Sequence, residues 1–547
     1  MAQSGIFNFS SFLSKQSLKE YNDPHNWHNL FRNQVVERVD ENIFRHLFCE
    51  DNGAPNASIR VLVGMNILKA ARNYSDAQLF EECKFNPLVR SALGLFNIDD
   101  SVPCKSTYYN FRQRIEAREA SGLGNLMEEV FASITKSQIM EFNINGSKAR
   151  MDSTLLGSNI AWNGRYALIH ETLRLAYRNG KSVLDKFLTE TDKEKLIQLF
   201  EKSAENVSYY SNKSELESKI TQFGSIIYTI VRNTQDTTIK AIMTLHRVFY
   251  EQYEIIDDVV KPLPKSRITA TSVQSPHDTD CHFHSKGETD VKGYTVNVCE
   301  IEDKEKKLKL TTDVKVEPAS HPDVAFFQPA IDRTQAIVSD KIETVNADGA
   351  FYSSDNQNYC TNNGIDFVVS AIQGDAPRYD LSLTADGVLL AFDTHKNILY
   401  EAENVKSHKP NSKVKWVITV DNKKRYFTER DLTNNQARKQ LLNRTIEELN
   451  FRNNNEASIF QYCYHFPDKK SCYRGLFKHQ LWAYFRGLWV NFRSLMKYIK
   501  KGGFKPINDG KIAVILHHFL HFSENLTNFI KKLFFQKKTD IDFQFLG

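Results

Sequence analysis

The sequence has few of the residues that define disulfide scaffolds or fibrous proteins. Its 547 residues include only 8 Cys, 23 Gly and 14 Pro. No two cysteines form a Cys-x-x-Cys pair, so we expect free thiols and a reducing, cytoplasmic environment. The low glycine content excludes a collagen-like chain. A globular protein remains, because 41% of the residues are hydrophobic and 25% are charged.

Long apolar segments are also missing. No run approaches the roughly 18 residues that a membrane-spanning helix needs. The first residues, MAQSGIFNFSSFLSKQ, lack a basic region followed by an apolar one, so we predict no secretion signal. The sequence contains no GxxxxGK[ST] loop, and we therefore expect a reaction that does not hydrolyse ATP.

Positive charge is concentrated near the C-terminus. The whole chain carries a net charge of +5, yet residues 451–547 hold 16 Lys and Arg against 6 Asp and Glu. A basic segment of this kind favours a polyanionic partner such as DNA. A solvated basic surface without a partner would have the same composition.

Residues 1–140 have the pattern of a helical domain. Apolar residues recur at helical spacing in 60–72, Ser75 is placed to cap the next helix, and Pro87 suits the first turn of a third. Ser106 is placed to cap the helix STYYNFRQRIEAREA, which follows a loop. This part of the chain therefore reads as several short helices.

The last of these helices is a candidate DNA reader. It carries Ser106, Tyr108, Arg112 and Arg114 after a helix and a loop, which is compatible with a helix-turn-helix-like element. A plain helical bundle would have the same spacing.

The periodicity changes twice after the helical region. A β-prone segment, KARMDSTLLGS, precedes a long helical stretch at about 165–260, whose apolar residues are expected to pair helices. If this stretch is an insertion, Asp152 lies beside the strand 294–300. From about residue 290 the period is two, and GYTVNVCEI and LKLTTDVKVEP flank a polar turn, which predicts a hairpin. Ser320, Pro322 and Asp323 are placed to open a helix, and 342–349 and 364–372 are predicted strands.

Without its insertions, the central region has the order β–β–β–α–β–β followed by a helix. We therefore predict a mixed α+β fold with a ribonuclease-H-like core, a helical insertion, a small β insertion and an all-α N-terminal domain. The predicted parts are a helical DNA-binding domain (1–140), the first part of the core (141–164), the helical insertion (165–265), the second part of the core (266–375), the β insertion (376–433), the core helices (434–500) and a helical tail (501–547).

Three acidic residues occupy notable places in this scheme. Asp152 lies on the first core strand, Asp348 at the end of the fourth, and Glu456 on the helix after the β insertion. In a ribonuclease-H-like fold these places converge, and hard oxygen ligands there would hold two Mg²⁺ about 3.5–4 Å apart. Taken singly, each aspartate also suits a turn or a cap, and Glu456 could pair with Arg452 one helical turn earlier.

Five ordered blocks are distributed over most of the chain. They are FNPLVRSALGL with PCKSTYYNFRQRI; RMDSTLLGSNIA; SVQSPHDTDCHFHSKGETDVKGYTVNV; VEPASHPDVAFFQPAI with VNADGAFYSSDN; and 451–492, which contains Tyr473-Arg474-Gly475 and Asn491. With these blocks the sequence resembles bacterial insertion-sequence DDE transposases, of the group called insertion sequence eleven-eighty-two within the insertion-sequence-four/five assemblage.

The resemblance implies an enzyme and its cofactor. It implies an endonuclease and strand-transfer enzyme in which Asp152, Asp348 and Glu456 are the catalytic metal ligands, with two Mg²⁺ or substituting Mn²⁺. The expected partners are the terminal inverted repeats of the element and target DNA. The expected form is a bacterial cytoplasmic protein that is nucleoid-associated and homodimeric on DNA.

One helix departs from the family pattern. The wider assemblage often has Tyr, two residues, Arg, three residues, Glu, six residues and Lys. Here Arg452 and Glu456 keep their spacing, whereas Leu449 and Cys463 stand at the Tyr and Lys places. A phosphate contact could instead come from Lys469, Lys470 or Arg474.

Further DNA contacts are expected near the C-terminus, where basic and aromatic residues alternate at helical spacing. We expect the aromatic residues, among them Trp482, Tyr484, Phe485 and Trp489, to face the core. The basic residues would then contact phosphates: Arg452, Lys469, Lys470, Arg474, Lys478, Arg486, Arg493 and Lys497.

Other functions fit the sequence less well. Cys281, His282 and His284 are close together but lack a distant fourth ligand for a tetrahedral zinc site. Asp278 and Asp280 fit either a place near the metals or a polar turn. A catalytically inactive DNA-binding relic of a transposase is the main alternative, and a helical scaffold is disfavoured by the strands at 290–372.

Overall fold

The computed structural model describes residues 9–48, 57–287, 289–372, 374, 376–405, 414–445, 448 and 453–503, and of Asn453–Glu456 the backbone only. The chain divides into two compact units, Met1–Met496 and Lys497–Gly547, and the features below belong to the first. Within the described residues, no helix combines the length and apolar character needed to cross a membrane.

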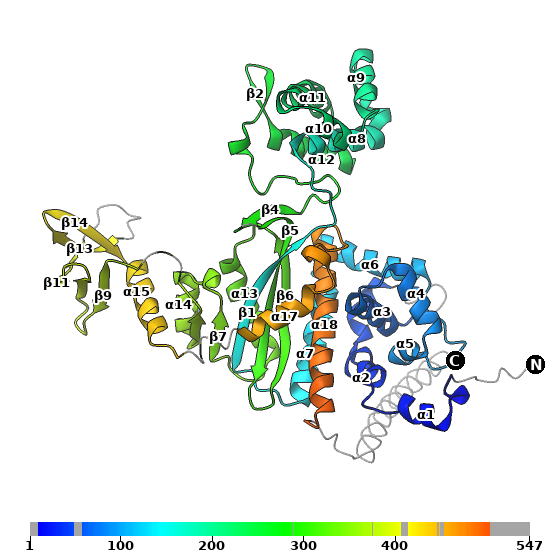
Figure 1. The fold of residues 1–547 in the computed structure, drawn as a ribbon, viewed down its shortest axis with the longest axis horizontal. Coiled ribbons are helices and arrows are strands. Elements are labelled where there is room, and N and C mark those ends of the chain that lie inside the picture. The colour runs from blue at the N-terminus through cyan, green and yellow to red at the C-terminus, as the bar shows by residue number, and fades with distance from the viewer. Residues whose placement is uncertain are drawn as a thin grey trace, which may run out of the picture. The chain divides into compact units, whose positions relative to one another are not determined.

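A six-stranded mixed sheet forms the centre of the first unit (Figure 1). β1 pairs antiparallel with β5 and parallel with β7; β8 extends the sheet beyond β7, and β4 and β6 both pair with β5. The strands are β1 (Lys148–Gly157), β4 (His282–Lys286), β5 (Thr289–Asp303), β6 (Leu308–Pro318), β7 (Thr344–Ala347) and β8 (Asp366–Val369).

The pairing of β1 bridges a long stretch of sequence. Asp152 lies opposite Val298, and Leu156 lies opposite Tyr294. The prediction that the strand of Asp152 pairs with residues 294–300 is therefore confirmed, as is the β5–β6 hairpin. Gly293 is required at the crossing of the strands, because a Cβ there would lie 2.1 Å from the carbonyl oxygen of Leu156.

A helical segment separates β1 from β4. Its helices are α8 (Arg165–Leu184), α9 (Glu190–Phe200), α10 (Ala204–Tyr210), α11 (Lys213–Asn233) and α12 (Lys240–Gln252). They share one apolar core that includes Phe223, Ile227 and Leu245, as their helical spacing predicts. The prediction of helix up to about residue 260 is wrong, because Tyr253–Ile256 and Val259–Pro262 form a hairpin, β2–β3. Asp257 and Asp258 form its turn with φ of 51° and 59°.

The residues between β8 and the last core helices form a small β segment with its own core. It contains two three-stranded sheets, β11–β10–β9 and β12–β13–β14, followed by α15 (Glu429–Leu442). The strands are β9 (Tyr379–Leu383), β10 (Leu389–Asp393), β11 (Ile398–Glu401), β12 (Glu403–Asn404), β13 (Val414–Val420) and β14 (Lys423–Thr428).

The N-terminal region is helical, as its pattern predicts. Ser75 caps α4 in a capping box with Gln78, and Pro87 is the first residue of α5. The predicted cap at Ser106 is wrong, since α6 begins at Lys105 with Cys104 as its N-cap residue. The helices are α1 (Lys15–Tyr21), α2 (Trp27–Gln34), α3 (Ile59–Arg72), α4 (Asp76–Phe85), α5 (Pro87–Ala92), α6 (Lys105–Ala120) and α7 (Leu126–Glu141).

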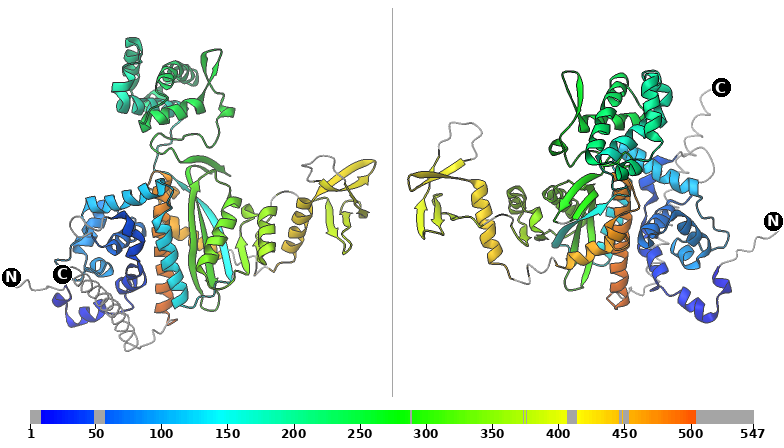
Figure 2. Two further views of the ribbon diagram at one scale, coloured as in Figure 1. Left: turned by 180° about the vertical axis from the view of Figure 1, so that it is seen from behind. Right: turned by 45° about the horizontal axis from the view of Figure 1, so that its top comes forward.

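Helix α18 (Leu476–Lys500) lies between the sheet and helices α2 and α3, whereas α7 packs against β6 on the sheet side (Figures 1 and 2). Trp489 and Phe492 pack against Phe31 of α2, with ring centroids 5.8 and 5.3 Å apart. On the sheet side, the amide of Asn491 donates to the carbonyl of Thr311 at 2.8 Å and its oxygen accepts the Thr311 N–H at 2.7 Å. The predicted burial of the α18 aromatic residues is confirmed.

Arg486 belongs to this buried helix and does not face solvent. Its side chain is 0% exposed, and its guanidinium donates to the carbonyls of Ala70 at 3.1 Å, Ala71 at 3.0 Å and Gln461 at 2.9 Å. The prediction that Arg486 contacts DNA is therefore wrong. Its charge instead satisfies the C-terminal carbonyls of α3, which a helix end leaves without internal partners.

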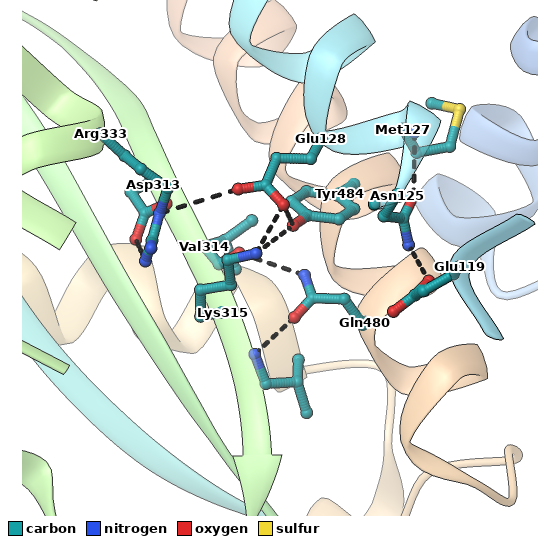
Figure 3. Close-up of polar contacts among 12 residues, drawn as sticks. Glu119, Asn125, Met127, Glu128, Asp313, Val314, Lys315, Arg333, Gln480 and Tyr484 are labelled. Atoms are coloured by element: carbon teal, nitrogen blue, oxygen red, sulfur yellow. Dashed lines mark hydrogen bonds and ion pairs between the residues drawn. The ribbon is translucent and has the colours of Figure 1, made fainter. Parts of the chain in front are cut away.

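A polar network joins α7, β6, α13 (Asp323–Ile337) and α18 (Figure 3). Lys315 donates to Glu128 at 2.6 Å, and the Tyr484 hydroxyl donates to the same carboxylate at 3.0 Å. Arg333 binds both oxygens of Asp313, at 2.6 and 2.9 Å. Because each buried charge has an opposite charge beside it, the network ties the helical region to the sheet without leaving an unpaired ion.

Asp278 holds the loop before α18 against the end of β1. This buried carboxylate accepts hydrogen bonds from the Ser158 hydroxyl at 2.5 Å, the Tyr294 hydroxyl at 2.6 Å and the Gly475 N–H at 2.9 Å. The N–H of Asp278 also donates to the Ser275 carbonyl at 3.2 Å, so of the two possibilities for Asp278 these contacts favour the turn, which here is buried and holds the loop.

His479 completes this junction as a neutral ring. Its Nδ1 lies 2.8 Å from the Gly475 carbonyl, which only accepts, so Nδ1 carries the proton and Nε2 accepts from the Ser471 hydroxyl at 2.6 Å. Burial lowers the pKa of His479 to about 4.

Replacing Arg486 should destabilise the protein much more than replacing a neighbouring arginine. Arg486→Met leaves three buried carbonyl oxygens without a donor, which should lower the free energy of unfolding by about 3 kcal/mol. Arg493→Met, on the exposed side of the same helix, should change it by less than about 0.5 kcal/mol. Urea unfolding followed by tryptophan fluorescence measures both, and equal effects would contradict the burial of Arg486.

Acid should weaken the junction around His479. The unfolded ring binds a proton near pH 6.5 and the buried ring only near pH 4, so stability falls as the pH drops through this window. The full loss for this residue is about 3 kcal/mol. His479→Gln should give a flatter dependence of unfolding free energy on pH between 6.5 and 4, and an unchanged slope would contradict the neutral ring.

Candidate functional site

Two predicted site residues lie side by side at one edge of the sheet. In the parallel pairing of β1 and β7, Met151 lies opposite Ala347, and Asp152 and Asp348 are the next residues on their strands. Neighbouring strands are about 4.8 Å apart, and residues in register point to the same face. The topology therefore brings both carboxylates to the same face at the carboxyl end of β7.

Backbone and hydroxyl groups orient the two carboxylates. Asp152 Oδ1 accepts the N–H of Ser153 at 2.9 Å. Asp348 Oδ1 accepts the N–H of Gly349 at 2.6 Å and the hydroxyl of Ser370 at 3.1 Å. Ser370 directly follows β8, so three adjacent strands contribute to this edge, β7 and β8 with their ends and β1 with its middle.

Gly349 permits the approach of β8. A Cβ at this position would lie 2.3 Å from the carbonyl oxygen of Ala371. Only glycine therefore lets the chain after β8 pass this close to Asp348. In the sequence Asp348-Gly349, the aspartate therefore supplies a carboxylate to this edge and the glycine allows the chain after β8 to lie beside it.

The helix that carries Glu456, α17 (Asn453–Cys463), lies on the same face of the sheet. Lys309 of β6 donates to the hydroxyl of Ser458 at 2.6 Å, and its ammonium lies 3.7 Å from the Glu300 carboxylate. Glu300 in turn pairs with the fully buried Arg150, which shares the β1 face of Asp152. The backbone of Glu456 lies two residues before Ser458, whereas its side chain is outside the described part of the structure.

Carboxylates at this edge have the chemistry of a divalent-cation site, because Mg²⁺ prefers carboxylate oxygens. Among the side chains that the structure describes, no group of three or more His, Cys, Asp or Glu is arranged to hold a metal. Asp152 and Asp348 are the described residues that would contribute ligands.

A loop after α17 brings basic residues beside Asp152. The N–H of Ser471 donates to the carbonyl of Gly157 at 2.8 Å, which fixes the loop on the end of β1. Lys469 then reaches the Thr154 hydroxyl at 3.2 Å, and Lys470 reaches the Ile160 carbonyl at 2.8 Å. Both bonds are to neutral oxygens, so they do not neutralise the ammonium charges.

These lysines line a cavity of about 690 Å³ whose wall includes Ser153 and Thr154, the two residues that follow Asp152, although Asp152 itself does not line it. Its other walls come from β1, the β4–β5 hairpin and the start of α13, where Asp323 accepts the Ser153 hydroxyl at 2.8 Å. Trp162 lies on its rim, 60% exposed, with the Lys292 ammonium 4.9 Å from the ring centroid. The sequence does not single out Trp162 or Lys292 as site residues, because neither belongs to a periodic pattern or a charge cluster, and it gives Asp323 only a place at the start of a helix.

Helix α6 presents a different face from the predicted one. Tyr108 is 0% exposed and donates to the side-chain oxygen of Asn66 at 2.7 Å, so the prediction that it contacts DNA is wrong. Its apolar partners Phe111 and Ile115, at helical spacing, would have signalled this burial. Ser106, Arg112 and Arg114 are accessible to different degrees, and the outward face also carries Asn110 and Gln113, which the sequence analysis did not single out.

The remaining basic candidates fall into three groups. Lys478, Arg493 and Lys497 are exposed along α18. Arg474 is exposed but donates to the Asn159 carbonyl at 2.6 Å, so it also fixes its own loop. Arg452 lies outside the described residues.

Cys281, His282 and His284 do not form a metal centre among the described residues. Cys281 is buried and its pKa is raised by burial. His282 Nδ1 lies 2.7 Å from the Ser320 hydroxyl. These contacts assign the segment to the packing of β4 against the start of α13.

Comparison with known proteins identifies one part of the chain. No curated protein and no solved structure matches the chain. Residues 17–114, which run from α1 into α6, match the family described as a transposase domain (DUF772). The N-terminal helices are therefore similar to a transposase domain, and this match supports a transposase family for the protein.

Proposed function

We propose that this protein is a DNA transposase that cuts the ends of its own element and joins them to target DNA by metal-dependent phosphoryl transfer. The observation that carries the proposal is the placement of Asp152 and Asp348 in register at one strand edge, beneath the helix of Glu456. The transposase domain at residues 17–114 supports it independently.

The sheet topology is consistent with a ribonuclease-H-like core. Along the order β6, β5, β1, β7, β8, two antiparallel pairings are followed by two parallel pairings, and α13 connects β6 to β7 in the sequence. The helical and β segments interrupt this order without changing the pairing. The specific group, insertion sequence eleven-eighty-two, rests on the sequence blocks alone.

Asp152, Asp348 and Glu456 would hold the divalent ions. The donor set fits, because both aspartates present carboxylate oxygens that N–H and O–H groups already orient. When bound, two Mg²⁺, or Mn²⁺ in their place, would activate the attacking water or 3′-hydroxyl and stabilise the leaving oxygen. The protein itself keeps the two aspartates on adjacent strands of the sheet, and Lys469 and Lys470 would hold the phosphate backbone beside them.

Recognition of the terminal repeats is assigned to α6. Its outward side chains include Asn110, Gln113 and Arg114, and amide and guanidinium groups read base edges in the major groove. Ser106, Arg112, Lys478, Arg493 and Lys497 would supply phosphate contacts. We expect two subunits to pair on DNA in the bacterial cytoplasm, one at each end of the element.

The main alternative is a DNA-binding relic without catalytic activity. Incubating the full-length protein with a duplex made from the DNA that flanks its gene, with Mg²⁺ or Mn²⁺, separates the two. Strand cleavage at the ends supports the transposase, whereas binding without cleavage under both ions supports the relic.

The three carboxylates should act as one unit. Asp152→Asn, Asp348→Asn and Glu456→Gln each remove one charge at nearly constant size, so each should reduce cleavage and joining by several orders of magnitude. Binding to repeat DNA should survive, because it depends on basic and polar groups elsewhere. Gel assays of binding and of strand cleavage measure the two effects separately.

Asp355→Asn is the matched control for these variants. Asp355 is an exposed acid in the first turn of α14 (Ser354–Asn363) and is not a proposed ligand, so its variant should retain most activity. If one of the three variants cleaved at a near-parental rate, that residue would lose its assigned role. Another acid, such as Glu447, Glu448 or Asp468, would then have to supply the third ligand.

Lys469 should matter for cleavage more than for affinity. Lys469→Gln removes a positive charge beside Asp152 and should slow single-turnover cleavage roughly 100-fold, as loss of one charge-stabilising donor does. Lys478→Gln removes an equal charge from an exposed position on α18 and should leave the rate nearly unchanged. Equal effects of the two substitutions would contradict the phosphate-holding role of Lys469.

A further inference from the structure

The hairpin formed by β13 and β14 carries positive charge that the site described above does not use. Lys423, Lys424 and Arg425 follow one another directly after the turn, and all three are exposed. They lie opposite Val420, Thr419 and Ile418 of β13. Tyr426, the next residue, is 55% exposed.

The hairpin is a rigid support for these side chains. Asp421 and Asn422 form its turn with φ of 50° and 57°, the left-handed conformation of a two-residue turn. Trp416, Ile418, Val420 and Phe427 place one face of the hairpin in the core of the β segment, from its base to the turn. The third strand, β12, pairs only with Trp416 and Val417, so the part that carries the cations is a two-stranded ribbon.

Neighbouring acids do not cancel this charge. Lys396 pairs with Asp421 at the turn, and Lys415 pairs with Glu429, so each of these acids already has its own lysine. The ion pairs within the described residues do not include Lys423, Lys424 or Arg425. The ribbon therefore carries a local surplus of three positive charges.

We propose that the β13–β14 hairpin is a second DNA-binding element, which enters the major groove of duplex DNA with its cations on the flanking phosphates. The major groove of B-DNA admits a two-stranded β-ribbon. Lys424 and Tyr426 share the face that points away from the core and would face the DNA. This inference deepens the proposed function, from which it takes DNA as the partner.

The same residues could instead protect the exposed edge of the sheet from pairing with other chains, without any DNA contact. β14 is the outer strand of its sheet, and lysines on such strands prevent pairing with other chains. The two roles differ in the sign of the charge that they need. Protection of the strand edge needs charge of either sign, whereas contact with DNA phosphates needs positive charge. Changing all three residues to Gln or to Glu therefore separates them.

The test measures binding of the full-length protein to a synthetic mixed-sequence DNA duplex over a range of salt concentrations. Lys423→Gln, Lys424→Gln and Arg425→Gln together should flatten the slope of log affinity against log salt by up to about 2.7, for three lost phosphate contacts. The corresponding Glu variant should bind still more weakly, yet remain as monodisperse as the parent. A matched control replaces Lys186, Lys195 and Lys202, exposed lysines of the helical segment, with Gln and should leave the slope unchanged.

An RNA duplex of the same sequence tests whether the hairpin enters the major groove. Its phosphate charge is similar, but its deep, narrow major groove does not admit a ribbon. The Gln substitutions should therefore reduce affinity for DNA more than affinity for RNA. An unchanged salt slope, or equal losses on both duplexes, would overturn the proposal. If the Gln variant still cleaved DNA and its slope of log affinity against log salt were unchanged, the hairpin proposal would fail and the proposed transposase function would stand. If the parent protein bound neither duplex, both the hairpin proposal and the proposed function would be refuted.

Discussion

Burial of α18 is the constraint on which the rest of the structure depends. A helix surrounded on nearly all sides must give each of its polar groups a partner, because an unsatisfied buried donor or acceptor costs about 1–3 kcal/mol. Asn491 and Gln480 bind the backbone of β6, while Arg486 binds the end of α3. One helix thereby fixes the transposase domain and the sheet to the same core.

This arrangement also determines where the candidate site lies. Asp278 and His479 hold the loop before α18 against the end of β1. This loop carries Lys469 and Lys470 toward the part of β1 that contains Asp152. α17 is held over the sheet by the contact between Lys309 and Ser458. Residues separated by about three hundred positions in the sequence therefore meet at one edge through buried polar contacts.

The spacing of side chains predicted those helices and strands that are specified by residues close together in the sequence. The hairpin of β5 and β6, the caps at Ser75 and Pro87, and the apolar faces of α11 and α12 all followed from side-chain spacing. The order of the elements was enough to predict the pairing of Asp152 with β5. The β2–β3 hairpin was missed because its turn residues, Asp257 and Asp258, lie in a stretch that otherwise continues a helical pattern.

Side-chain roles were harder to predict than elements. Arg486 and Tyr108 were assigned to DNA because their residue types suit it, but their neighbours in space are the carbonyls of α3 and the side chain of Asn66. Such tertiary partners leave no local signal in the sequence. The cavity beside Asp152 was missed for the same reason, since its walls come from four separate segments.

Iron-directed cleavage of the protein backbone tests the central claim most directly. Fe²⁺ replaces Mg²⁺ at carboxylate sites, and with peroxide and ascorbate it cuts the chain next to the bound ion. The account predicts cuts close to Asp152, Asp348 and Glu456, suppressed by excess Mg²⁺ and lost in Asp152→Asn. Cuts confined to other segments, or cuts that Asp152→Asn leaves unchanged, would contradict a metal site shared by these three residues.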